Sequence, residues 1–225
     1  MKDEKLVKEL YNKQFKKYSK EQTKYRVIQD LRRKIYNLLG NIKNKKILFA
    51  GCGDGRECLP AIRKKAKVFG IDISEIAIEF ARKNCPKGKF CVRNFEETGF
   101  SKGFFDMVIS ILSLMYKKNI VPVLKEFKRV LKPKGSIILV VPHPVRKMIK
   151  YNNLNYFIKG KKWENWRGIK RFNYYRLFED YFDAFIKAGL KVVKLKEPKP
   201  VKETKKTPDT EINHPHFLIF KLVKD

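Results

Sequence analysis

Three glycines spaced two residues apart follow a short apolar run and precede helix-forming residues. The run is residues 46–50 (KILFA), and the glycines are Gly51, Gly53 and Gly55. Because glycine has no Cβ, a Gly-x-Gly-x-Gly turn lets the backbone approach a ligand closely. A helix that starts after the turn adds amide N–H groups that have no intrahelical partner. The spacing therefore predicts a binding site for a nucleotide-like ligand at the end of a buried strand.

Two ligand classes use such a turn, the dinucleotides and S-adenosylmethionine. The dinucleotide fingerprint requires a small residue three positions after its second glycine. In this chain that position holds Arg56 or Cys58, depending on which pair of glycines is counted. Asp72 ends the next apolar segment, about twenty residues further on, where an acidic side chain can accept hydrogen bonds from both ribose hydroxyls. The acid strengthens the nucleotide interpretation, and the missing small residue weakens the dinucleotide one.

Two further segments follow in order, CVRNFEETGFSKGFFDMVIS at 91–110 and LKEFKRVLKPKGSIILVVPHP at 124–144. With the glycine turn and Asp72, they make residues 46–142 resemble class I S-adenosylmethionine-dependent methyltransferases, of the type 11-like, small-molecule branch. The resemblance implies a Rossmann-like α/β fold, with a seven-stranded, mostly parallel sheet, a reversed last strand and helices on both faces. It also implies an enzyme with S-adenosyl-L-methionine as its cofactor.

The resemblance assigns cofactor contacts residue by residue. The glycine turn would lie against the cofactor, Asp72 would bind the ribose, and Ile73 would lie beside the adenine. Asn94 and Phe95 fall near the adenine, where the family usually has an aspartate and a small apolar residue. Ser110 would lie near the methionine half. The implied cofactor-binding set is Gly51, Cys52, Gly53, Gly55, Asp72, Ile73, Asn94, Phe95 and Ser110.

Phe49 departs from the family pattern, which usually has an acid two residues before the first glycine. That acid helps to hold the amino-acid portion of the cofactor. Its replacement could weaken cofactor binding, or leave the ammonium group to backbone carbonyls and to Asp54. The departure keeps open a non-catalytic cofactor-binding protein with the same fold.

Methyl transfer is an in-line displacement, so the alignment of the two reactants matters more than acids and bases. Alignment can lower the activation barrier by roughly 7–11 kcal/mol. His143, in VPHPV, is a candidate to take a proton from a hydroxyl or an amine, with a structural turn residue as the alternative. Tyr116 could line the acceptor pocket. We therefore predict His143 and Tyr116 as catalytic residues. Further candidates for the pocket or a lid, or for simple packing of the insertion, are Trp163, Trp166, Phe172, Tyr174, Tyr175 and Arg176.

The elements that position these residues follow from the apolar periodicity. Residues 3–39 have a helical pattern, and strand and helix patterns then alternate up to residue 141. Such alternation favours a mostly parallel sheet with helices on both faces. Regularity stops at 142–175, which is typical of an insertion beside a binding site. We expect an N-terminal helical cap at 1–40 and a methyltransferase domain at 41–225, in which 142–175 form a lid and acceptor-site insertion.

The charge raises a second class of function. The chain has 53 Lys and Arg against 23 Asp and Glu, a formal net charge of +30. Clustered basic residues favour nucleic acids, but here they are spread over nearly every segment. We expect a small-molecule acceptor, and RNA binding, if any, that is non-specific. An RNA methyltransferase that uses the basic surface is the alternative.

The remaining features concern location and metals. The first twenty residues are charged throughout, without the apolar core of a secretory signal, and no apolar run is long enough to cross a membrane. We therefore expect a cytoplasmic protein with no membrane partner. The four cysteines form no Cys-x-x-Cys pair, so we expect no metal site. The acceptor atom, the pathway and the oligomeric state stay open.

Overall fold

The computed structural model describes the chain apart from residues 1, 25, 147, 149–154, 200–212 and 225. Its main element is a seven-stranded sheet with the strand order β3-β2-β1-β4-β5-β9-β8. These strands are β1 (Lys46–Ala50), β2 (Lys67–Asp72), β3 (Lys89–Val92), β4 (Phe105–Ile111), β5 (Leu131–Pro142), β8 (Leu190–Lys196) and β9 (Phe217–Lys224). Strand β9 runs antiparallel to both of its neighbours, whereas β1 to β5 pair in parallel. The predicted mostly parallel sheet with a reversed last strand is confirmed.

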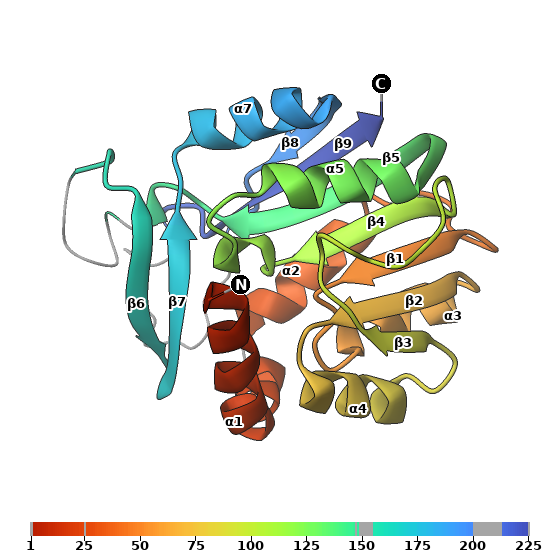
Figure 1. Cartoon of the computed structure of the whole chain (residues 1–225), viewed down its shortest axis with the longest axis horizontal. Helices are drawn as coiled ribbons and strands as arrows, with labels where there is room; N and C mark the ends of the chain where they lie inside the picture. The colour runs from red at the N-terminus through yellow and green to blue at the C-terminus, as the bar shows by residue number, and fades with distance from the viewer. Residues whose placement is uncertain (1, 25, 147, 149–154, 200–212, 225) are drawn as a thin grey trace.

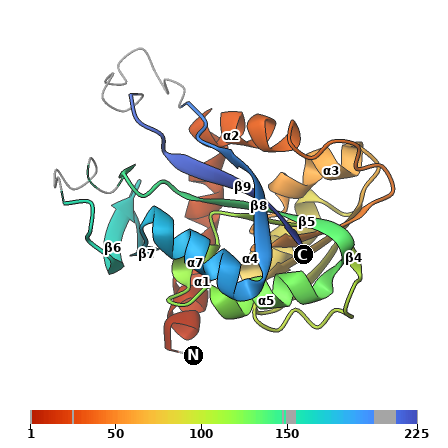
Figure 2. The same ribbon diagram turned by 90° about the horizontal axis from the view of Figure 1, so that it is seen from above.

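Helices lie on both faces of this sheet, as Figure 2 shows for α2 and α3 on one side and α5 and α7 on the other. The described helices are α1 (Lys2–Lys24), α2 (Arg26–Tyr36), α3 (Leu59–Arg63), α4 (Glu75–Asn84), α5 (Val121–Val130) and α7 (Phe178–Ala188), with the short 3-10 helices η1 (Arg56–Cys58) and η2 (Leu114–Tyr116). The helical segment expected at 3–39 is thus two helices, α1 and α2. None of the described helices combines the length and the apolar character that crossing a membrane requires.

The apolar run of β1 is buried on both sides of the sheet. Successive side chains of a strand point to opposite faces. Ile47 and Phe49 therefore join one core cluster, with Ile35 of α2, and Leu48 joins the other, with Phe127 of α5. A strand covered on both faces needs a continuous apolar sequence, which is why KILFA has no polar alternation.

The carboxyl end of β1 lies at a switch point of the sheet. From β1 the chain continues to β2 and β3 on one side, and β4 then pairs with β1 on the other side. Loops that leave neighbouring strands in opposite directions open a crevice at this point, where ligands of open α/β sheets bind. Figure 1 shows α1 standing across this edge, between the sheet and a separate hairpin.

That hairpin consists of β6 (Gly160–Trp166) and β7 (Ile169–Tyr175), paired antiparallel. Its turn residues Arg167 and Gly168 have φ of 52° and 75°. Two consecutive positive φ angles are typical of the tight turns that match the twist of a hairpin. Two regular strands therefore lie within the stretch for which the sequence indicated no regular period.

Candidate active site

The glycine turn after β1 has left-handed backbone at all three glycines, with φ of 74°, 51° and 76° at Gly51, Gly53 and Gly55. A Cβ at Gly51 would lie 2.4 Å from the Cβ of Ser113, and one at Gly55 would lie 2.9 Å from the Cα of Ala81 in α4. A Cβ at Gly53 would meet no protein atom within 4 Å. Gly51 and Gly55 therefore serve close packing, while Gly53 leaves its backbone open toward a cavity.

This cavity encloses about 90 Å³ beside the turn and beneath α1. The sheet side contributes the ends of β1, β2 and β4 and the segments that follow them. Its lining residues are Glu4, Val7, Tyr11, Phe15, Tyr18, Gly51, Gly53, Asp72, Ile73, Arg93, Asn94, Phe95, Ile111, Leu112, Ser113, Tyr116 and Lys117. Six of the nine residues expected to bind the cofactor, and the expected catalytic Tyr116, thus lie around one cavity.

Asp72 ends β2 with its carboxylate directed at the glycine turn. Its Oδ2 accepts a hydrogen bond from the N–H of Gly53 at 3.0 Å, and its Oδ1 accepts one from the N–H of Ser74 at 3.1 Å. Burial raises the pKa of the Asp72 carboxyl above its ordinary value, and these two backbone bonds oppose the shift. The carboxylate is held at the open side of Gly53, where it can accept further bonds from ribose hydroxyls.

The N-terminal helix closes the cavity with one of its faces. Five of its residues line the cavity at spacings of three and four, which is one face of a helix; these are Glu4, Val7, Tyr11, Phe15 and Tyr18. Sequence reasoning missed this set. The recurrence of tyrosine and phenylalanine at 11, 15 and 18 was the available signal.

Polar bonds fix α1 in this place. Asn12 donates to Glu75 at 2.9 Å and accepts from the Ser74 hydroxyl at 2.6 Å, at the start of α4. Ser19 donates to Asp54 Oδ2 at 2.6 Å, beside the turn. Asp54 is not among the described residues that line the cavity. The acid that the sequence suggested for the cofactor ammonium binds Ser19 of α1 instead.

Tyr116 meets the N-terminal helix through its hydroxyl, which lies 2.5 Å from the hydroxyl of Tyr11. Burial raises the pKa of Tyr116, although the Arg171 guanidinium acts in the opposite direction. Burial likewise raises the pKa of Tyr11 well above its ordinary value. Both hydroxyls therefore stay protonated at neutral pH, so they can donate and accept hydrogen bonds but do not act as phenolate bases.

His143 lies apart from the residues that line the cavity. Its ring is 3% exposed, packs edge-on against Phe178 and has Nε2 2.7 Å from Glu197 Oε1. The N–H of Val145 donates to Nδ1, so the neutral ring carries its proton on Nε2 and donates it to Glu197. Burial lowers the pKa of His143 despite Glu197. Its catalytic role stays a prediction, and the structure gives it a structural partner instead.

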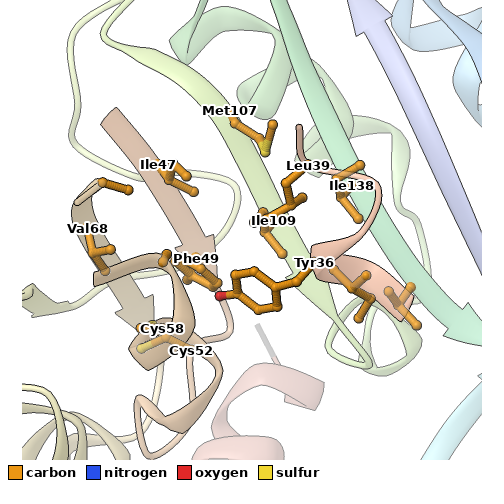
Figure 3. Packing of buried hydrophobic residues seen from close by; sticks show 14 of the residues in the cluster. Tyr36, Leu39, Ile47, Phe49, Cys52, Cys58, Val68, Met107, Ile109 and Ile138 are labelled. Atoms are coloured by element: carbon orange, nitrogen blue, oxygen red, sulfur yellow. The ribbon is translucent and has the colours of Figure 1, made fainter. Parts of the chain in front are cut away.

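Three expected cofactor residues lie behind the cavity wall rather than on it. Ser110 is fully buried, with its hydroxyl 2.6 Å from that of Ser113, which does line the cavity. Gly55 packs on α4, and the side chain of Cys52 is buried in the core. Figure 3 shows Cys52 in the cluster that also holds Phe49, toward which the ring of Tyr36 points. Phe49, where the family usually has an acid, thus serves the core.

The aromatic residues of the hairpin pack behind α1. Phe172 is fully buried, with its ring centroid 5.8 Å from that of Tyr116, and the ring of Trp166 lies 5.7 Å from that of Tyr18. Trp163 remains 44% exposed. Among the described residues, α1 forms the cover of the cavity, and the hairpin supports that cover from outside.

These features define a Rossmann-like α/β protein with a glycine-lined cavity at the switch point of its sheet. Residues 41–180 match the sequence family described as a methyltransferase domain, and the chain belongs to this family. It is an S-adenosylmethionine-dependent methyltransferase of class I, as the four motifs predicted.

Individual relatives agree with this assignment. An uncharacterized protein of Haemophilus influenzae is 26% identical over 186 residues, 72% of this chain and 73% of that protein. The demethylmenaquinone methyltransferase of Tropheryma whipplei is 27% identical over 145 residues, 62% of this chain and 61% of that protein. The chain thus spans about three fifths of the length of that enzyme. A solved structure from Listeria monocytogenes, a putative S-adenosylmethionine-dependent methyltransferase, has a TM-score of 0.74 at 25% identity and covers 86% of this chain and 96% of its own.

Proposed function

We propose that this chain methylates a small-molecule acceptor that binds beneath α1, next to the glycine turn. The observation that carries the proposal is the cover over the site, because aromatic side chains of α1 line the same cavity as the glycine turn. Catalysis of an in-line displacement needs alignment and the exclusion of water, and an apolar cover provides both.

The residues of the cavity fit the cofactor. Gly53 leaves space for close approach, and Asp72 presents a carboxylate for the ribose hydroxyls. Ile73 and Phe95 would hold the adenine between apolar surfaces. When bound, S-adenosylmethionine supplies an electrophilic methyl group on a positively charged sulfur. The chain itself then needs only to place the acceptor in line with that methyl group.

Tyr11 and Tyr116 would orient the acceptor. Their hydroxyls form a protonated pair in a setting of aromatic rings, so either can bind an acceptor oxygen or nitrogen. The rings of Tyr11, Phe15 and Tyr18 also line the cavity, where they would favour a cationic sulfur by cation-π attraction.

Two basic residues near the cavity are paired with acids of α1, which argues against an RNA acceptor. Lys117 pairs with Glu4, and Lys161 lies 2.7 Å from Asp3. A site for a splayed base needs basic side chains around its mouth and exposed aromatics for stacking. Demethylmenaquinone, named for one relative, is a small molecule, which also supports this choice.

The test is a transfer assay with labelled S-adenosylmethionine against a metabolite fraction and against total RNA at physiological salt. We expect label in a low-molecular-weight product and none in RNA. Label at one site of one RNA, with none in the metabolite fraction, would refute the small-molecule acceptor.

A further inference from the structure

The amide of Asn94 is held from both ends at the side of the cavity where the adenine is proposed to lie. Its Oδ1 accepts from Lys117 Nζ at 3.0 Å and from the N–H of Glu96 at 3.2 Å. Its Nδ2 donates to Glu4 Oε1 at 2.8 Å. Ammonium and backbone N–H groups only donate, and an ionised carboxylate only accepts, so these bonds fix which amide atom is the oxygen.

This arrangement changes what Asn94 can offer a base. A carbonyl oxygen has two lone pairs, and Lys117 and Glu96 already donate to the Oδ1 of Asn94. The atom that should accept from the adenine amino group is therefore already engaged. An aspartate at this position would have had a second carboxylate oxygen to offer.

Glu4 brings a carboxylate to the same place from α1. It lines the cavity with Asn94 and Phe95, and its side chain is 24% exposed. Burial works against ionisation, but the bonds from Lys117 and Asn94 hold the pKa of Glu4 below its ordinary value. An ionised carboxylate has two oxygens that accept hydrogen bonds, and the bonds from Asn94 and Lys117 both go to Oε1.

We propose that Glu4, rather than Asn94, is the residue that accepts a hydrogen bond from the exocyclic amino group of the cofactor's adenine. The inference rests on the proposed cofactor site, with the base between Ile73 and Phe95. Adenine presents an N–H donor at this position, whereas hypoxanthine presents a carbonyl oxygen. A carboxylate attracts the first and repels the second, so Glu4 sets the specificity for the base and links its recognition to the helix that closes the cavity.

The experiment compares two ligands by titration calorimetry, S-adenosylhomocysteine and S-inosylhomocysteine, in which a carbonyl oxygen replaces the amino group. Wild-type protein should prefer the adenosyl compound. In Glu4→Gln the ratio of the two affinities should fall about tenfold or more, because the charged acceptor is lost and an amide N–H can donate to the carbonyl. Lys8→Met is the matched control, since Lys8 lies on the same helix in an exposed ion pair with Glu75. This control should keep the wild-type ratio.

If Glu4 only held α1 in place, Glu4→Gln would weaken the binding of both ligands equally. An unchanged ratio of the two affinities in Glu4→Gln would therefore overturn the proposal. The double variant Glu4→Gln/Asn94→Asp guards against a general defect of the first variant. It places a carboxylate at residue 94 and should restore the preference for the adenosyl compound. If wild-type protein bound neither ligand, the proposed cofactor site itself would fail, which is a separate and recognisable result.

Discussion

At the residue scale, Gly53 and Gly55 share a left-handed backbone but differ in what surrounds them. Alanine at either position costs about 1–2 kcal/mol for the backbone conformation alone. At Gly55 the new Cβ would also meet the backbone of Ala81 at 2.9 Å, whereas at Gly53 it would enter the open cavity. We expect Gly55→Ala to lower the melting temperature more than Gly53→Ala, and Gly53→Ala to lose S-adenosylhomocysteine binding with the fold intact. Thermal denaturation with and without the ligand measures both effects, and normal binding by Gly53→Ala would contradict the site.

Asp72 gives the cofactor site a pH dependence. The ribose hydroxyls donate to an ionised carboxylate, and protonation removes that acceptor. Burial raises the pKa of Asp72, so affinity for S-adenosylhomocysteine should be full at neutral pH and should fall on acidification, starting above the ordinary carboxyl pKa of about 4. Titrations at several pH values should show this loss in the wild type and a flatter profile in Asp72→Asn. Equal pH profiles would show that another group controls binding.

At the scale of elements, α1 is the cover of the site, and its dynamics should respond to the cofactor. Its aromatic face lines the cavity, and Asn12 and Ser19 bond to groups beside the glycine turn. We expect S-adenosylhomocysteine to slow amide hydrogen exchange in α1 as well as in the turn. Helix α7, which packs with α5 on one face of the sheet, should keep its exchange rate. Protection confined to the turn would contradict the role of α1.

The sequence predicted the sheet and the glycine turn because each depends on local patterns. Buried parallel strands have continuous apolar runs, and the turn needs glycine at fixed positions. The order of motifs then gave the family. The reversed direction of β9, by contrast, was predicted only from that resemblance, because the apolar periodicity of a strand is the same in both directions.

The features that the sequence could not predict are mostly contacts between elements that lie far apart in the chain. The face of α1 with Tyr11 and Phe15 has the same spacing as any helix that packs on a core, so its contact with the cavity was not visible. The hairpin turn has Arg167 before Gly168 instead of the asparagine that usually marks such turns. His143 directly follows β5, but its bond to Glu197 joins residues 54 positions apart in the chain.

At the scale of the whole molecule, the net charge of +30 should give RNA binding that is electrostatic only. If six or more phosphates are contacted, affinity for RNA should fall by about a thousandfold or more between roughly 50 and 200 mM salt, without preference for sequence. Filter binding with unrelated RNAs measures this. RNA binding that resists salt and selects one sequence would instead favour the RNA methyltransferase alternative.

The most direct test of the central claim is a calorimetric titration of the wild-type chain with S-adenosylhomocysteine, repeated with Asp72→Asn and with Asp106→Asn. Asp106 bonds to the N–H of Lys46 and to Lys132 at the other end of β1, so its variant controls for the loss of a carboxylate away from the cavity. We predict one binding site per chain, with affinity lowered about ten- to a hundredfold in Asp72→Asn, equivalent to about 1.5–3 kcal/mol for a charged hydrogen bond, and little changed in Asp106→Asn. No binding by the wild type, or equal affinity in Asp72→Asn, would contradict a cofactor site at the glycine turn.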